Sequence, residues 1–239
     1  MCSLPAQPTA AGRPPRLVRE GLWLFAPSRD SQGGSAWWLE HEAAGGGRAG
    51  LLVDVPAHNE ANLAFLQERG AGLAGGRIVL TGREGHGRLR RFQEALGWPV
   101  HVQEQEAYLL PGVQRLEPFG AEHRLDAGLD LLWTPGPTPG AAVLLASPPV
   151  AAESILFCGR LLSPVAPGQL APLRTRRSFH WSRWLRSLER LRGWLPAEQP
   201  QWLASGAGLG ALRGEVLVEG GRRVLEQLDL SALAAQEPV

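Results

Sequence analysis

The sequence contains no lysine, and its 24 basic residues are all arginine. Against 23 acidic residues this leaves a formal net charge of only +1, so overall charge favours neither nucleic acid nor a membrane surface as a partner. Without lysine, the glycine-rich stretch GAGLG at 206–210 lacks the cation used by phosphate-binding loops, and we interpret it as a turn.

Cysteine is scarce, with only Cys2 and Cys158 in the chain. Two such distant residues exclude a disulfide framework and favour a reducing compartment. No apolar run reaches the roughly 18 residues needed to cross a bilayer. The N-terminus also lacks the basic and apolar regions of a secretory signal. We therefore expect a cytoplasmic protein that does not act in a membrane.

The composition is that of a soluble globular protein, with 44% apolar and 20% charged residues among 239. Residues 1–15 are rich in proline, alanine and glycine without apolar periodicity, which predicts a flexible tail. The rest of the chain is long enough for one large domain or two small ones.

Apolar periodicity predicts strands first, then alternating strands and helices, then more strands and closing helices. Strands are expected at 17–25 (a pair), 36–41, 50–56, 77–80, 99–103, 129–134, 141–146, 154–158 and 201–204. Helices are expected at 59–70, 88–96, 104–110, 182–194 and within 209–228. Residues 164–172 are expected to form an irregular loop. Periodicity alone does not fix how these elements are arranged.

Three stretches carry the functional argument: LTGREGHG at 80–87, TPGPTPG at 134–140 and LFCGRLL at 156–162. The first follows an apolar strand and precedes a helical segment, a common position for a catalytic loop. In this order the stretches resemble the signature of the metallo-β-lactamase-fold hydrolases, which reads T-H-x-H-x-D-H, T-P-G-H-T-P-G and L-F-x-G-D. The resemblance implies an α/β (α+β) fold, a four-layer αββα sandwich, with residues 16–239 as a single domain.

The same comparison shows that the family's metal ligands are mostly replaced. When the first motif is aligned from Thr81 without a gap, its first two histidines fall on Gly82 and Glu84, and its aspartate falls on His86. If one residue is deleted from the motif, its last histidine falls on His86 instead. Pro137 stands at the histidine of T-P-G-H-T-P-G, and Arg160 at the carboxylate that would bridge two metals. The last histidine falls on Ala207. The resemblance thus implies that these six positions are the remains of a metal site in which most of the ligands have been replaced.

In this family one or two metal ions, usually zinc, make hydroxide available near neutral pH. A tetrahedral zinc site needs at least three protein ligands, and Glu84 with His86 supplies two. His180 or His58 could add a third, although no spacing demands it. We therefore expect no metal and no cofactor, with zinc only if the site has been rebuilt. Asp54 matches the strand-end aspartate that supports the metal ligands from behind, although a turn role would serve as well.

The paired replacement at positions 84 and 160 suggests a direct contact. A guanidinium in a cavity built for cations would need an anion, and Glu84 is the nearest candidate in the motif. We predict that the Glu84 and Arg160 side chains approach to about 3 Å and close the former metal site. The alternative is that both are ordinary surface charges.

Arginines also gather in two clusters, one at 83–91 and one at 174–192, the second interleaved with Phe179, Trp181 and Trp184. Such a pattern fits RNA binding weakly, and it fits solvated helix faces and core packing better.

Three functions follow from these patterns. The first is a non-catalytic binding or regulatory pseudoenzyme whose partner is a small anionic ligand or another protein. The second is an active hydrolase of an ester, thioester or phosphoester with a rebuilt site. The third is an RNA- or anion-binding module.

The stretches 103–112 (QEQEAYLLPG), 169–175 and 179–181 (FHW) resemble cyanobacterial and plastid members of the family. This resemblance favours a branch of the family that has lost its metal ligands.

Overall fold

The computed structural model describes residues 12–43 and 45–238 of the chain. Most of the predicted flexible tail, residues 1–11, lies outside the described residues. Residues 12–15 are described and belong to no helix or strand.

The first β-sheet combines antiparallel and parallel strands in the order of the sequence. Its first four strands form antiparallel pairs, and its last four, starting from β4, run parallel. Its strands are β1 (Arg16–Arg19), β2 (Leu22–Phe25), β3 (Ala36–Glu42), β4 (Arg48–Val53), β5 (Gly75–Val79), β6 (Val100–Gln103) and β7 (Leu116–Phe119).

The second sheet has the order β15-β14-β11-β10-β9-β8, and only its β11–β14 pair is parallel. Its strands are β8 (Glu122–Asp126), β9 (Leu129–Trp133), β10 (Ala142–Ala146), β11 (Ile155–Gly159), β14 (Trp202–Ser205) and β15 (Val218–Glu219). A separate antiparallel pair consists of β12 (Ser163–Ala166) and β13 (Gln169–Ala171).

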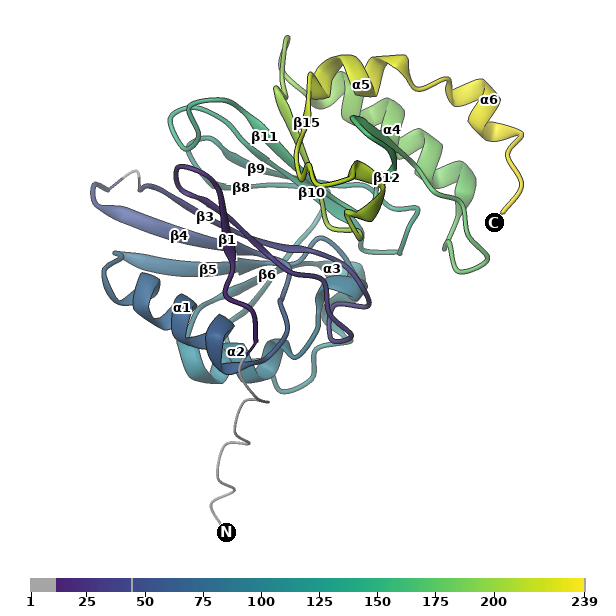
Figure 1. Cartoon of the computed structure of the whole chain (residues 1–239). Helices are drawn as coiled ribbons and strands as arrows, with labels where there is room; N and C mark the ends of the chain where they lie inside the picture. Colours follow the sequence, from purple (N-terminus) through teal and green to yellow (C-terminus); the bar gives the residue numbers. More distant parts are fainter. Residues whose placement is uncertain (1–11, 44, 239) are drawn as a thin grey trace.

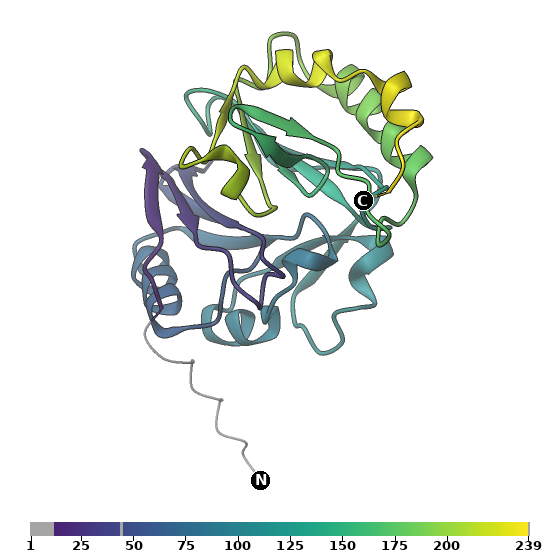
Figure 2. The ribbon, with the colours of Figure 1, turned by 45° about the vertical axis from the view of Figure 1, so that its right-hand side comes forward.

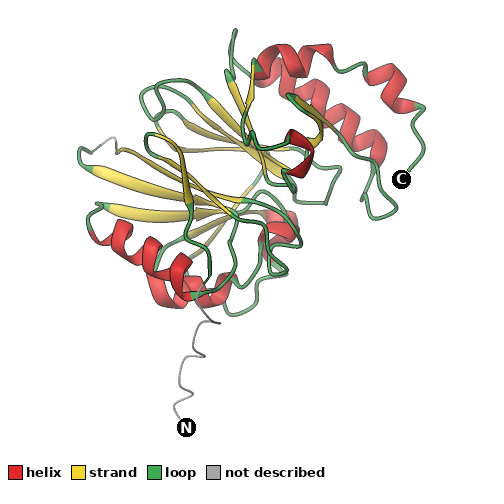
Figure 3. Ribbon diagram, viewed as in Figure 1, coloured by secondary structure: helices red, strands yellow, loops and turns green. Residues whose placement is uncertain are grey.

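Helices cover the two outer faces, so that the order of layers is helix, sheet, sheet, helix (Figures 1 and 3). Helices α1 (Glu60–Ala71) and α2 (Leu89–Leu96) lie beside the first sheet, with the short α3 (Glu104–Ala107) near its end. Helices α4 (Trp181–Trp194), α5 (Gly221–Gln227) and α6 (Leu230–Ala234) lie beside the second sheet. Figure 2 shows the same separation from a second direction. Single turns of 3₁₀-helix occur at η1 (Arg83–Gly85) and η2 (Gly210–Leu212).

Strand β3 explains why both faces of the first sheet are buried. Successive side chains of a strand point to opposite faces. Trp37 therefore joins the core between the sheets, where its ring lies 6.2 Å from that of Phe157, and Trp38 joins the core under α1 and α2. There Trp38 stacks on Trp98 at a centroid distance of 5.3 Å. The absence of a side chain at Gly76 makes space for the Trp98 ring, because a Cβ at position 76 would lie 2.2 Å from a ring atom of Trp98.

Helix α1 illustrates how local sequence sets an element boundary. The Asn59 side chain accepts a hydrogen bond from the Asn62 N–H at 2.9 Å, an N-cap that satisfies one of the free donors of the first turn. Leu66 is fully buried against the first sheet. In α4 the apolar stripe of Trp184, Leu188 and Leu191 packs on the second sheet, as the helical spacing predicts.

Some predicted elements differ from the structure. The expected loop at 164–172 contains the β12–β13 hairpin, and β7 and β8 lie where no strand was predicted. The closing segment 209–228 contains η2, β15 and α5, and α6 follows it, instead of one or two helices within it. Strands β7, β8, β12, β13 and β15 have two to five residues each, and the strands beside them supply their hydrogen bonds. None of the helices within the described ranges is long and apolar enough to span a membrane.

Candidate functional site

The three motif stretches meet at one end of the two sheets. Asp54 follows β4, Thr81 lies just beyond β5 and Arg160 follows β11, so that loops from both sheets face one another. They enclose a cavity of about 10 Å³, which is room for about one water molecule. The cavity is lined by Ser31, Gly34, Ser35, Asp54, Thr81, Gly82, Glu84, Gly85, Pro137, Ala141, Arg160 and Gly206.

Asp54 forms the back of this cavity and is only 5% exposed. Its Oδ1 accepts from the Thr81 backbone N–H at 2.8 Å, and its Oδ2 accepts from the Thr81 hydroxyl at 2.5 Å. Asp54 has φ +58°, a left-handed conformation that Asp and Asn tolerate better than most residues. Burial raises the pKa of Asp54 to about 6, although the Thr81 bonds and nearby Arg160 oppose the rise. The carboxylate is therefore already engaged on both oxygens.

Glycines let the chain close tightly around Asp54. A Cβ at Gly85 would lie 2.1 Å from the Asp54 Oδ1, and one at Gly206 would lie 3.1 Å from its Oδ2. These contacts come from two loops far apart in the sequence. The position of Asp54 at the strand end is that expected from the sequence, and the structure shows how closely it is enclosed.

Glu84 lies in η1 and also lines the cavity. Burial raises the pKa of its carboxyl group, whereas Arg160 and Arg83 lower it. Gly82, which begins this turn, accepts a hydrogen bond from the Gly85 N–H at 2.9 Å. The first stretch thus folds into a tight 3₁₀ turn that places the Glu84 side chain in the cavity lining.

Arg160 does not make the contact predicted from the sequence. Its Nη2 donates to the carbonyl oxygens of Gln32 at 2.9 Å and Ser31 at 3.1 Å. No ion pair within 4.0 Å joins Arg160 to Glu84, so the prediction of a direct contact at about 3 Å is wrong. The two side chains nevertheless line one cavity and influence each other electrostatically. The backbone of the loop before β3 supplies acceptors that a sequence motif does not reveal.

Pro137 and Ala207, two more of the replaced positions, are buried in turns. The Pro137 carbonyl accepts from the Phe179 N–H at 3.1 Å, which ties the TPGPTPG turn to the segment before α4. The Ala207 N–H donates to the Ser205 hydroxyl, and its carbonyl accepts from the Ser35 hydroxyl, both at 3.1 Å. Pro137 lines the cavity, and Gly206 rather than Ala207 completes its wall.

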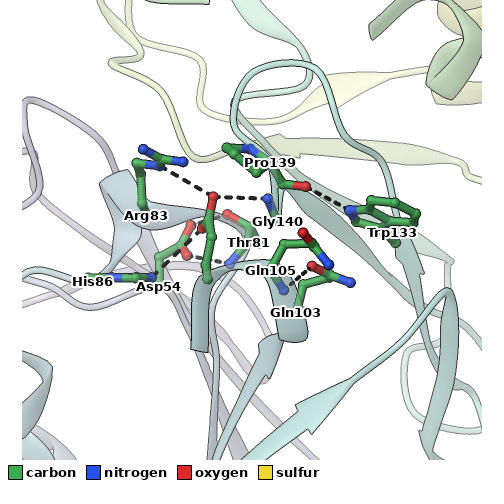
Figure 4. A network of polar contacts seen from close by, with 10 residues as sticks. Asp54, Thr81, Arg83, His86, Gln103, Gln105, Trp133, Pro139 and Gly140 are labelled. Atoms are coloured by element: carbon green, nitrogen blue, oxygen red, sulfur yellow. Dashed lines mark hydrogen bonds and ion pairs between the residues drawn. The ribbon is translucent and has the colours of Figure 1, made fainter. Parts of the chain in front are cut away.

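His86 does not line the cavity, and its ring lies near a buried acid. Its Nε2 lies 3.9 Å from Oε2 of Glu106, which has no exposed surface. The other oxygen of Glu106 accepts from the Gly140 N–H at 3.0 Å and from Arg83 Nε at 3.4 Å (Figure 4). Burial lowers the pKa of His86, and the negative charge of Glu106 opposes this. The last glycine of TPGPTPG is therefore fixed by an acid on α3.

His180 is the N-cap of α4 and lies exposed at the surface. Its Nδ1 contacts the Ser182 hydroxyl at 3.2 Å and the Arg183 N–H at 3.4 Å, and its own backbone N–H donates to the Gly136 carbonyl. The side chain lies outside the cavity lining.

The structure therefore brings together five of the eight residues singled out from the sequence: Asp54, Gly82, Glu84, Pro137 and Arg160. His86, Ala207 and His180 lie elsewhere. Sequence reasoning did not single out Thr81 as a partner of Asp54, nor Glu106. Glu106 follows exposed Glu104 in a four-residue helix, and no pattern distinguishes the buried acid from the solvated one.

The residues around the cavity do not fit the metal that the sequence resemblance implies. No group of three or more His, Cys, Asp or Glu side chains suited to a metal ion occurs in residues 12–43 and 45–238. Two carboxylates reach the cavity, and the Asp54 oxygens are both engaged by Thr81. A zinc site needs at least three protein ligands, and the third charged group here is a guanidinium.

No protein-family model matches the sequence, and no curated protein matches it. Several solved structures are similar to this chain. A B3 metallo-β-lactamase with an active-site glutamic acid is similar over 94% of this chain and 90% of that chain, with 19% identity and a TM-score of 0.59. A metallo-β-lactamase from Staphylococcus aureus subsp. aureus COL is similar over 91% and 68%, with 15% identity and a TM-score of 0.61.

A quorum-quenching N-acyl homoserine lactone lactonase is similar over 77% of this chain and 90% of that chain, with 17% identity and a TM-score of 0.52. The layered α/β architecture is thus that of a large group of hydrolases. The chain has the metallo-β-lactamase fold, and the fold predicted from the three stretches is confirmed.

Proposed function

We propose that this chain is a non-catalytic member of its fold class, a binding or regulatory protein that acts in the cytoplasm and belongs to a branch that lost its metal ligands. The observation that carries the proposal is the small cavity at the ligand positions. It is only about 10 Å³ in volume, and Arg160 enters it where the bridging carboxylate is expected.

The charges around the cavity support the same proposal. The Arg160 guanidinium is a cation that offers hydrogen-bond donors and no lone pair to a metal ion. Two backbone carbonyls hold its Nη2 in place. A divalent cation at this position would lie close to a fixed positive charge, and among the described residues that line the cavity Asp54 and Glu84 are the only carboxylates.

A rebuilt hydrolytic site would need Glu84, His86 and His180 together. Glu84 faces the cavity, His86 faces Glu106 and His180 caps α4 at the surface. Of the three, Glu84 alone lines the cavity, so this cavity does not gather them into a shared metal site or proton relay. The geometry therefore favours the binding role over the hydrolase.

The test is the metal content of protein purified without chelator and without a histidine tag. Elemental mass spectrometry should find less than about a tenth of an equivalent of zinc, iron or manganese per chain, even after incubation with added zinc, since fewer than three ligands are present. An active enzyme of the same fold, treated in parallel, controls for loss of metal during purification.

A full equivalent of metal that survives dialysis would overturn the proposal. Chelator-sensitive hydrolysis of an ester, thioester or phosphoester would do the same. Variants Glu84→Gln, His86→Ala and His180→Ala would then identify the ligands.

A further inference from the structure

A larger groove opens beside the small cavity and shares Arg160, Glu84 and Pro137 with it. Its volume is about 380 Å³, within the range of small-molecule sites. Two further arginines, Arg176 and Arg177, line it, together with the apolar side chains of Leu173 and Trp184. One part of the groove is therefore strongly basic and another is apolar.

Backbone hydrogen bonds hold the two distal arginines over the groove. The Phe179 N–H donates to Pro137 O at 3.1 Å, and the His180 N–H donates to Gly136 O at 3.0 Å. Within the same segment Ser178 closes a turn, since its hydroxyl accepts from the Thr175 N–H at 2.9 Å. Arg176 and Arg177 lie in this turn, so their position relative to Arg160 is fixed by the chain.

The three arginines have no acidic partner at hydrogen-bonding distance. No carboxylate among the described residues lies within 4.0 Å of Arg160, Arg176 or Arg177, whereas Arg83, Arg88 and Arg90 elsewhere are each paired. Arg160 uses only Nη2 in hydrogen bonds to described residues and leaves Nε and Nη1 available. Against three cations the groove contains one acid, Glu84, so it carries an excess of positive charge.

The apolar wall is preorganised as well. Trp184 is 3% exposed, and its Nε1 donates to Leu161 O at 2.9 Å, which fixes the orientation of the indole. Leu173 is 38% exposed and stands free to cover a ligand. A basic region beside an apolar one suits a ligand that has an anionic group and a small hydrocarbon part.

We propose that this groove binds a small organic oxyanion, a phosphate or carboxylate compound, through Arg160, Arg176 and Arg177, with its apolar part against Leu173 and Trp184. Arg176 and Arg177 can each present paired N–H donors to two oxygens of either oxyanion. Arg160 can add a single donor from Nε or Nη1, because its Nη2 is held by two backbone carbonyls. The inference rests on the proposed binding function and names its ligand class.

The experiment measures binding of inorganic pyrophosphate and of citrate to chelator-treated protein by titration calorimetry, with Trp fluorescence as a second signal. The test variant is Arg176→Gln/Arg177→Gln, in which both residues are exposed and neither makes an ion pair. The matched control is Arg183→Gln/Arg186→Gln, which removes the same charge from exposed positions on α4 outside the groove. The metal content of each preparation is determined in parallel.

In the test variant the affinity for the anion should be at least about tenfold lower than in wild type, and in the control it should lie within about twofold of wild type. The reason is that a charge-assisted hydrogen bond to the anion is stronger than the general effect of a surface charge. Tighter pyrophosphate binding would identify phosphate compounds, and tighter citrate binding would identify carboxylates. Binding reduced equally in both variants, or no binding of either anion at millimolar concentration, would overturn the inference.

The two proposals fail separately. Metal-free protein that binds neither anion disproves the anion site and leaves the non-catalytic role standing. Protein with a full equivalent of metal disproves the non-catalytic role, whatever the anion titration shows.

Discussion

Replacement of Asp54 by Asn tests whether the carboxyl group at the back of the small cavity is a buried charge that lowers stability at neutral pH. Asn has the same shape and tolerates the left-handed backbone at φ +58°. Its side-chain oxygen can still accept from the Thr81 N–H, and its amide can donate to the Thr81 hydroxyl. The substitution therefore removes the ionisable group and leaves the local geometry unchanged.

The magnitude follows from the pKa of Asp54, which burial raises from 3.8 to about 6. A raised pKa means that the folded state holds the proton more tightly than the unfolded state. The contribution of Asp54 to the free energy of unfolding is then fully present below about pH 4, falls as the pH rises from about 4 to 6, and is lost above that. A rise of about two units corresponds to about 3 kcal/mol at neutral pH.

The assay is urea unfolding followed by Trp fluorescence, with wild type and Asp54→Asn compared between about pH 4 and pH 8. The variant's stability relative to wild type should increase by about 3 kcal/mol across this range, and nearly all of the change should occur below pH 7. Asp126→Asn, which removes a half-exposed carboxylate from β8, should show a much smaller change. Parallel curves for wild type and Asp54→Asn, or a change in the opposite direction, would refute the reasoning.

Two further predictions concern the Glu106 network. In Glu106→Gln the pKa of His86 should fall further, because the negative charge that opposes the effect of burial is removed. An NMR titration of the His86 imidazole measures this pKa, and the exposed Glu104→Gln serves as the control. An unchanged or higher pKa of His86 in Glu106→Gln would contradict the prediction. Gly140→Ala should lower the free energy of unfolding by about 1–3 kcal/mol through overpacking, since the new Cβ would lie 2.6 Å from the Glu106 Cγ. In Gly120→Ala the new Cβ would have no atom within 4 Å, so this substitution should leave the free energy of unfolding nearly unchanged in the same urea assay. Equal effects of the two substitutions would rule out the contact with Glu106 as the cause.

The larger elements could be predicted because their patterns are local. The apolar stripe of α4 and the Asn59 cap of α1 are properties of short stretches of chain. The β12–β13 hairpin and strands β7 and β8 were missed because most of their side chains are exposed or only partly buried, so that no apolar pattern marks these strands in the sequence.

The sequence by itself determined the fold and the replacements within its motifs. The frame of TPGPTPG requires a tight turn of Pro and Gly, and Pro137 and Arg160 show directly that no ligating atom stands at those positions. The aspartate at the end of β4 was likewise predicted, and it does line the cavity.

Only the tertiary structure decided where each charge points. Arg160 binds the carbonyls of residues 31 and 32 and not Glu84, His86 turns to the buried Glu106, and His180 remains at the surface. These contacts join segments that are 20 to 129 positions apart in the chain. A side chain takes the partner that the packed backbone places within reach, and the spacing of a motif carries no information about that partner.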